Sequence, residues 1–232
     1  MSVAVIITAS GSGLRVGGDM PKQFQPIGGK PVLAHTMAAF NQAQIVGKIV
    51  VTAPEEYVNH AWEIATANKY EKVRGVIAGG ASRAESIYAA LKALPFMGNT
   101  GQEIVLIHDG VRPFVSEDLI KAVAKAAQAH GAAIVGTPLT DTVKEVDKKL
   151  KITSTPDRSR LWRVQTPQGF TYDMLMKAYA QGEKDGVLPQ ATDDSMLVER
   201  LGIKVTMVEG APENIKITTP VDMALGEILL KG

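Results

Sequence analysis

The chain alternates between short apolar runs and longer stretches with helical spacing. The apolar runs have the length of strands and lie at Val3–Ala9, Lys48–Ala53, Val73–Ala78, Glu103–His108 and Ala132–Thr137. The stretches between them, several of which open with Pro or Ser as helices do, lie at Pro31–Ala43, Glu55–Asn68, Ser82–Leu94 and Ser116–His130. Strands that are apolar on both faces and alternate with helices predict an α/β fold, with a parallel sheet covered on both sides. Ligands then bind beyond the carboxyl ends of the strands.

The pattern changes after Thr137. Residues 138–158 are polar, alternating and β-branched, with a turn-like Asp147-Lys148-Lys149 in the middle, and predict a hairpin arm. An isolated two-stranded hairpin is only marginally stable, so the arm needs a surface to lie against, which a second subunit often provides. A homodimer formed through the arm is therefore one hypothesis.

The remainder of the chain returns to the α/β pattern. We expect helices near Thr171–Gln181, Asp193–Leu201 and Pro220–Leu230, and strands near Lys204–Glu209 and Ile215–Thr218. The whole chain, 1–232, is expected to form a single domain, with 138–158 as a β-arm subdomain.

Composition narrows the class of protein. Lys and Arg number 25 against 24 Asp and Glu, which gives a net charge of +1 and no bulk field for nucleic acid or anionic membrane. Hydrophobic residues at 45% and charged residues at 21% are ordinary globular values and exclude disorder. The chain has no Cys, and its first apolar run is broken by glycine far short of a membrane span, so we expect no disulfides, no signal peptide and a cytoplasmic location.

The loop after the first strand is the most informative segment. Residues 8–31 are rich in glycine and contain the cations Arg15, Lys22 and Lys30, a combination that can wrap and neutralise a phosphate chain. The segment does not match the dinucleotide-binding glycine motif, the P-loop or the nucleophile elbow, so a dehydrogenase, a P-loop NTPase and an α/β-hydrolase are not supported.

Two further strand ends carry candidate chemistry. Asp109 follows the fourth apolar run and would face the phosphate loop, where one carboxylate together with substrate phosphates can hold Mg²⁺. Gly79-Gly80 ends the third run and leads into a helix N-terminus, which can meet an anion. The four histidines have no metal-binding spacing, and we expect His108 to be a packed or hydrogen-bonded neighbour of Asp109.

The order and spacing of these motifs resemble the 2-C-methyl-D-erythritol 4-phosphate cytidylyltransferase family over essentially the whole chain. The matching positions are Gly11, Gly13, Arg15 and Pro21-Lys22-Gln23; Gly79-Gly80, Arg83 and Ser86; His108-Asp109 and Arg112-Pro113; Asp141-Thr142; Asp157-Arg158 and Trp162; Thr166-Pro167-Gln168; Thr192-Asp193; and Asn214-Ile215-Lys216. The resemblance implies a Rossmann-like nucleotidyltransferase fold with a mostly parallel sheet and a protruding β-hairpin dimerisation arm. It also implies transfer of CMP from CTP to methylerythritol phosphate, with release of pyrophosphate, in the non-mevalonate route to isoprenoids, by a Mg²⁺-dependent homodimer.

The resemblance assigns roles residue by residue. Arg15 and Lys22 match the pair that stabilises the transition state, Arg158 and Lys216 match the residues that hold the substrate phosphate, and Asp109 matches the metal-side aspartate. Nucleotide contacts are matched by Ala9, Ser10, Gly11, Gly13, Gly80, Ala81 and Ser86, and contacts around the second substrate by Arg112, Thr142, Thr166 and Thr192.

The chemistry fits a site without a general base. A phosphate monoester has a second pKa near 6, so it is already ionised at neutral pH, and the reaction needs mainly charge neutralisation by cations and Mg²⁺. Two alternatives stay open. Gly110-Val111 after Asp109 is similar to the related pentitol-phosphate cytidylyltransferases, which would change the acceptor to ribitol 5-phosphate. The other is a module that binds CTP without catalysis.

Overall fold

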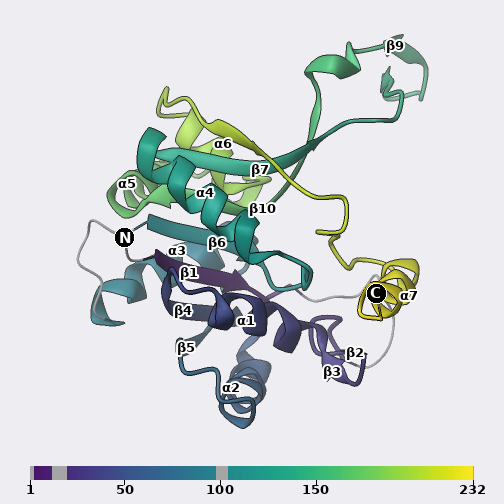
Figure 1. Cartoon of the computed structure of the whole chain (residues 1–232). Coiled ribbons are helices and arrows are strands. Elements are labelled where there is room, and N and C mark those ends of the chain that lie inside the picture. The colour runs from purple at the N-terminus through teal and green to yellow at the C-terminus, as the bar shows by residue number, and fades with distance from the viewer. Residues whose placement is uncertain (1–2, 12–19, 98–103, 232) are drawn as a thin grey trace.

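A computed structural model describes residues 3–11, 20–97 and 104–231. Its described part contains a seven-stranded sheet with the strand order β11-β7-β10-β6-β1-β4-β5 (Figure 1). The strands are β1 (Val3–Thr8), β4 (Val46–Ala53), β5 (Val73–Ala78), β6 (Ile104–Asp109), β7 (Ala132–Pro138), β10 (Trp162–Thr171) and β11 (Thr206–Glu209). All neighbouring pairs are parallel except those of β10, which runs antiparallel to both β6 and β7. The predicted mostly parallel α/β sheet is confirmed.

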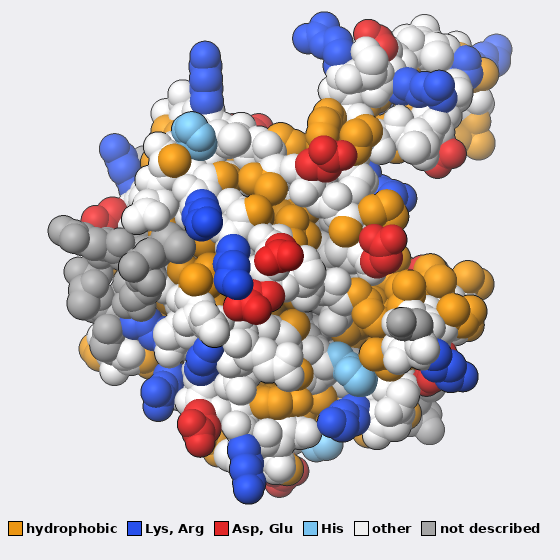
Figure 2. All heavy atoms as spheres, viewed as in Figure 1, with side chains coloured by type: hydrophobic (Ala, Val, Ile, Leu, Met, Phe, Trp, Pro, Cys, Tyr) orange, Lys and Arg blue, Asp and Glu red, His pale blue; other side chains and the backbone are white. Residues whose placement is uncertain are grey.

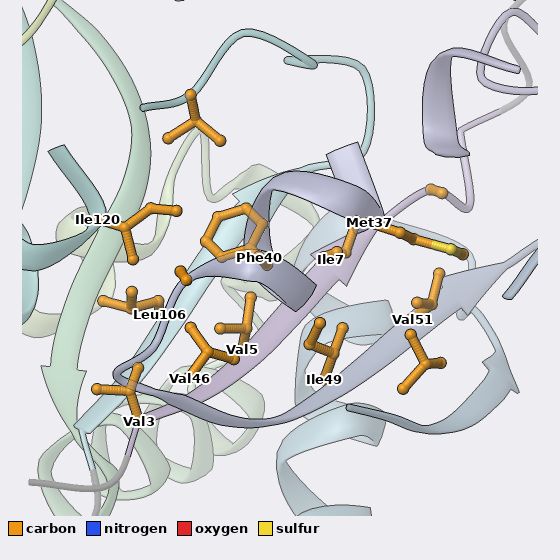
Figure 3. Packing of buried hydrophobic residues seen from close by; sticks show 14 of the residues in the cluster. Val3, Val5, Ile7, Met37, Phe40, Val46, Ile49, Val51, Leu106 and Ile120 are labelled. Atoms are coloured by element: carbon orange, nitrogen blue, oxygen red, sulfur yellow. The ribbon is translucent and has the colours of Figure 1, made fainter. Parts of the chain in front are cut away.

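Helices cover both faces of the sheet because successive strand residues point to opposite sides. Val3, Val5 and Ile7 of β1 pack with α1 (Val32–Gln42), α2 (Val58–Ala67) and α4 (Glu117–His130). Figure 3 shows this layer, with Met37 and Phe40 of α1 above the strand residues. Ala4 and Ile6 of β1 face the other way, toward α3 (Arg83–Ala93), α5 (Tyr172–Lys184) and α6 (Asp194–Glu199).

The arm stands away from the sheet between β7 and β10 (Figure 1). It contains the short antiparallel strands β8 (Glu145–Val146) and β9 (Ile152–Ser154), all of whose residues are exposed. The hairpin therefore has no core of its own within this chain. The helix α7 (Pro220–Leu229) ends the described chain and also exposes apolar side chains, among them Val221 and Ile228, and Figure 2 shows apolar side chains over this helix and on the arm.

One prediction about the later part of the chain is wrong, and one strand was missed. Residues Ile215–Thr218 form no strand: within them Ile217 donates one backbone hydrogen bond to Val111, at 2.9 Å, and its side chain is buried in a small cluster with Ile27 and Val32. The strand β10 was not anticipated at all. A small hairpin of β2 (Pro26–Ile27) and β3 (Lys30–Pro31) precedes α1. Among the described residues, no helix is both long and apolar enough to cross a membrane.

Candidate active site

A cavity of about 670 Å³ opens at the carboxyl ends of β1 and β6 and at the N-terminus of α3. Its described lining is formed by Thr8, Ala9, Ser10, Gly11, Lys22, Gln23, Gly80, Ala81, Ser82, Arg83, Asp109, Val111 and Lys216. Three of these side chains are cations and one is a carboxylate. The lining therefore suits a negatively charged ligand large enough to be a nucleotide.

Close approach of two turns shapes the wall of this cavity. Ser10 donates a hydrogen bond to Ser86, at 2.8 Å between the hydroxyl oxygens, and the Ser86 hydroxyl also accepts the Gly80 N–H at 3.0 Å. A Cβ at Gly79 would lie 2.3 Å from the Ser10 Cβ, so only glycine lets the turn after β5 come this near to the loop after β1. Ser86, itself a predicted nucleotide contact, lines neither cavity and instead supports the wall from behind through Ser10 and Gly80.

Asp109 is the centre of the charge arrangement. Its carboxylate receives Lys216 Nζ at 3.0 Å and Arg112 Nε at 3.2 Å on Oδ2, and Arg83 Nε lies 3.6 Å from Oδ1. Burial alone would raise the pKa of Asp109, but the charges of Arg83, Lys216 and Arg112 outweigh it and hold that pKa far below its ordinary value. Asp109 is therefore ionised at neutral pH.

A second cavity of about 540 Å³ lies on the other side of this charge cluster. It is lined by Arg112, Ile134, Val164, Gln165, Thr166, Gln168, Thr192, Asp193, Ser195, Met196, Glu199 and Met207, together with Arg83, Asp109 and Lys216. The last three residues line both cavities. A group bound in one cavity can therefore meet a group bound in the other beside Lys216 and Arg83.

A chain of hydrogen bonds fixes the strand end that carries Asp109. The Asp109 N–H donates to the Thr166 hydroxyl at 3.1 Å, and that hydroxyl is 3.0 Å from Nδ1 of His108. His108 Nε2 is 3.0 Å from the Arg112 carbonyl, which can only accept, so the proton sits on Nε2 and Thr166 donates to Nδ1. Burial lowers the pKa of His108 to about 4, so the ring is neutral. The expectation of a packed, hydrogen-bonded His108 is confirmed.

Arg112 is anchored in the same network. Besides Asp109, its guanidinium donates to the Asn214 carbonyl at 2.8 Å, and the Asn214 amide donates to the Thr166 carbonyl at 2.8 Å. Asn214 is fully buried. These contacts bind the segment that carries Lys216 to the turn after β6 and to the middle of β10.

The structure brings together most of the predicted site residues. Ala9, Ser10, Gly11, Lys22, Gly80, Ala81, Asp109 and Lys216 line the first cavity, and Arg112, Thr166 and Thr192 line the second. Gly13 and Arg15 lie outside the described residues. Thr142 and Arg158 lie on the exposed arm and line neither cavity within this chain; the Arg158 guanidinium donates instead to the Thr140 carbonyl at 2.8 Å.

Four side chains of the site carried no predicted role. Arg83 lines both cavities and its Nη2 lies 2.7 Å from Asp194 Oδ2, while Gln23 donates to the carbonyls of Ala9 and Gly11. Gln168 holds the N-terminus of α6 by accepting the backbone N–H of Asp194 at 3.0 Å. Gln23, Arg83 and Gln168 stood among the positions that match the family motifs but were given no role, whereas nothing in the sequence singled out Asp194.

The family model described as 2-C-methyl-D-erythritol 4-phosphate cytidylyltransferase matches residues 3–232. The chain belongs to this family. Two relatives of that name, from Symbiobacterium thermophilum and Syntrophotalea carbinolica, are 42% and 44% identical, each over 99% of this chain and over 93% and 97% of their own lengths. The crystal structure of 4-diphosphocytidyl-2C-methyl-D-erythritol synthase from Anaerococcus prevotii has a TM-score of 0.85 at 32% identity and covers 100% of this chain and 96% of its own.

These matches confirm the predicted family, the nucleotidyltransferase class and CTP-dependent cytidylyl transfer in isoprenoid precursor synthesis. The structure of the 2-C-methyl-D-erythritol 4-phosphate cytidylyltransferase from Francisella tularensis, with a TM-score of 0.84 at 29% identity over 98% of this chain and 99% of its own, shows the same fold.

Proposed function

We propose that this chain binds CTP in the first cavity and 2-C-methyl-D-erythritol 4-phosphate in the second, and joins them with release of pyrophosphate. The two substrates are assigned to these cavities because both cavities are lined by Arg83, Asp109 and Lys216. The acceptor phosphate attacks the α-phosphorus, so the two phosphates must meet where both cavities can be reached. The glycine-containing turns beside the first cavity suit the nucleotide.

The described cations then neutralise the reacting phosphates. Arg83, Arg112 and Lys216 outnumber the two carboxylates they contact, Asp109 and Asp194, so the cluster keeps one excess positive charge. Lys22 adds another cation to the first cavity. Positive charge placed beforehand around the α-phosphate stabilises the negative charge that accumulates there in the transition state. No general base is required, since the attacking phosphate is already ionised. His108, which is buried and neutral, is accordingly given no proton-transfer role.

We further propose that Asp109 takes part in holding Mg²⁺. Among the described residues, no cluster of three or more His, Asp or Glu could hold a metal ion by itself. One ionised carboxylate nevertheless fits Mg²⁺, which takes one or two carboxylates and completes its shell with substrate phosphates and water. Asp109 Oδ1 suits this role, because its contact with Arg83 is the long one, at 3.6 Å, whereas Oδ2 contacts Lys216 and Arg112 at 3.0 and 3.2 Å. When bound, the metal would neutralise charge on the nucleotide phosphates.

The homodimer belongs to the same proposal. The arm exposes the apolar residues Val146, Leu150 and Ile152, with 49%, 81% and 64% of their surface accessible, and has no core to cover them. Burying them against a second copy would stabilise the hairpin, and it would also carry Thr142 and Arg158 toward the partner's second cavity. The predicted cytoplasmic location and the single-domain organisation with its arm stay predictions.

An acceptor panel tests the proposed function. The chain is incubated with CTP, Mg²⁺ and either methylerythritol phosphate, ribitol 5-phosphate or erythritol 4-phosphate, and pyrophosphate release is followed. We expect kcat/KM to be highest for methylerythritol phosphate, and Lys216→Ala to lower kcat by about 10²- to 10³-fold, as removal of one transition-state donor does. Turnover of ribitol 5-phosphate alone would show that the chain is a pentitol-phosphate cytidylyltransferase. Binding of CTP without pyrophosphate from any acceptor would make it a non-catalytic module.

A further inference from the structure

Arg83 is held between two carboxylates from different parts of the fold. Its Nη2 lies 2.7 Å from Asp194 Oδ2, and its Nε lies 3.6 Å from Asp109 Oδ1. The shorter contact is therefore to Asp194, which lines neither cavity. An arginine side chain has many rotamers, and a fixed ion pair at one end restricts where its charge can lie.

Asp194 is itself fixed by its backbone and neighbours. It is the first residue of α6, and Gln168 accepts the backbone N–H groups of both Asp194 and Ser195, at 3.0 and 3.2 Å. Asp193 caps the same helix by accepting the Met196 N–H at 3.0 Å. The backbone of Asp194 therefore cannot shift without breaking several buried hydrogen bonds.

Tyr179 orients the Asp194 carboxylate from behind. Its hydroxyl donates a hydrogen bond to Asp194 Oδ1, and both side chains are fully buried. Burial, together with the charge of Asp194, raises the pKa of Tyr179 well above its ordinary value, so the hydroxyl stays protonated and remains a donor. Tyr88 stacks on the Tyr179 ring at 5.6 Å between centroids, which holds the ring in place.

We propose that Asp194, oriented by Tyr179, is a positioning residue that holds the Arg83 guanidinium at the wall shared by the two cavities. Neither Asp194 nor Tyr179 lines a cavity, and both act through Arg83. Without this anchor Arg83 would turn fully onto Asp109 and compete there with Lys216, which lies 3.0 Å from the same carboxylate. The inference rests on the proposed function, because the consequence concerns where the transferred phosphate is neutralised.

The decisive experiment compares two tyrosines of the same helix. Tyr179→Phe removes the hydroxyl that orients Asp194, whereas Tyr172→Phe removes a hydroxyl of α5 that donates to the Leu91 carbonyl, at 3.2 Å, away from the site. We expect Tyr179→Phe to lower kcat about tenfold with KM for CTP within about threefold, because a displaced catalytic group mainly costs turnover. Tyr172→Phe should keep kcat within about twofold at a similar loss of Tm.

A coupling measurement separates positioning from general destabilisation. If Tyr179 acts through Asp194 and Arg83, the Tyr179→Phe/Asp194→Asn double variant should lose no more kcat than Asp194→Asn alone, and Tyr179→Phe should have little further effect in an Arg83→Lys background. Additive losses, or equal losses of kcat in the two tyrosine variants, would overturn the inference. If Asp194→Asn does not fold, the comparison of tyrosines and the Arg83→Lys background still decide it.

A second readout is independent of turnover. The NMR signal of the Arg83 Nε–H, assigned by its disappearance in Arg83→Lys, should exchange faster with solvent or broaden in Tyr179→Phe and stay unchanged in Tyr172→Phe. Absence of pyrophosphate release from the parent protein would reject the proposed function. The positioning role would then be tested by the Arg83 Nε–H signal alone. An unchanged Arg83 signal in Tyr179→Phe would reject the positioning role whether or not the parent protein turns over.

Discussion

Asp109 balances three cations in the structure, and we propose that the same carboxylate also helps to hold Mg²⁺. Three cations contact it, at 3.0, 3.2 and 3.6 Å, and its removal would leave buried guanidinium charge uncompensated. We expect Asp109→Asn to lower the free energy of unfolding by about 3–5 kcal/mol, as breaking a buried ion pair does, and to raise the Mg²⁺ concentration needed for activity.

Urea unfolding and a Mg²⁺ titration of activity check both effects of Asp109→Asn. The control is Glu199→Gln, which changes an exposed carboxylate at the rim of the second cavity and should cost less than about 1 kcal/mol. Unchanged stability together with an unchanged Mg²⁺ curve would remove Asp109 from both tasks.

His108 should make stability depend on pH. Its pKa in the folded protein is about 4, below the value of about 6.5 in an unfolded chain, so the unfolded chain binds more protons between these values. The free energy of unfolding should therefore fall as pH drops from 6.5 to 4, by about 3 kcal/mol from this residue. Asp109, whose folded pKa is depressed, adds its own loss only below about pH 4.

Chemical denaturation of the parent protein and of His108→Gln at a series of pH values isolates this contribution. The difference in unfolding free energy between them should narrow steadily as pH is lowered from 6.5 to 4. A difference that is the same at pH 7 and pH 4.5 would show that His108 titrates normally, and hence that the Thr166–His108–Arg112 chain of hydrogen bonds is looser than described.

At the scale of single residues, the sequence predicted those site residues that end a strand or directly follow one. Asp109 and the glycines after β5 were found because parallel strands end at one edge of the sheet. The ion pair between Arg83 and Asp194 could not be predicted from the sequence, because the two residues are 111 positions apart. Asp194 follows the helix-capping Asp193, and nothing in that local pattern distinguishes a buried ion-pair partner from a solvated carboxylate.

At the scale of elements, β10 is the strand that the sequence pattern did not predict. Its sequence contains Pro167 and Gly169, which are usually excluded from central strands. The register with β7 shifts between Gln165 and Gln168, and the proline sits in this irregularity, where no ladder donor is required. Conversely, the apolar pattern of Ile215–Thr218 reflects burial of Ile217 against a small cluster rather than pairing in a sheet.

Gly169 allows α4 to pack closely on β10. A Cβ there would lie 2.9 Å from Leu106 Cδ2, 3.0 Å from Val123 Cγ1 and 3.1 Å from Ala127 Cβ. Gly169→Ala should therefore lower the free energy of unfolding by about 1–3 kcal/mol through overpacking, as measured in urea. The control is Gly226→Ala in α7, where the nearest atom would be at 3.4 Å and helix propensity favours alanine. If the parent protein and Gly169→Ala are equally stable, the packing of α4 on β10 adjusts to the added methyl group without a measurable cost.

The arm can be tested as an element by mixing subunits. If it crosses to the partner, each active site takes Lys22 from one chain and Arg158 from the other. Lys22→Ala and Arg158→Ala chains, each nearly inactive, should then recover about a quarter of parental activity after exchange, since half of the dimers are mixed and each has one intact site. Activity that stays at the level of the separate variants, with exchange confirmed by mass, would place the arm on its own chain.

At the scale of the whole molecule, charge is local rather than global. The net charge of +1 gives no overall attraction for a polyanion, and Figure 2 shows cationic and anionic side chains scattered over the visible face. The excess positive charge instead lies where Asp109, Arg83, Arg112 and Lys216 converge. Composition shows that no bulk field attracts nucleic acid, but it could not locate this concentration of charge, which depends on the chain crossing the sheet several times.

The place of β10 in the sheet has a consequence for synthesis on the ribosome. The four strands β5, β4, β1 and β6 are neighbours and are complete before the arm emerges. By contrast β7 has only β10 and β11 as neighbours, and both are made after it. The nascent chain therefore carries an apolar strand that has no partner until the whole arm has been translated, and β6 presents an open edge for the same interval. Insertion of β10 covers the open edges of both β6 and β7. We therefore expect slow translation across the arm to lengthen the time in which these edges can aggregate.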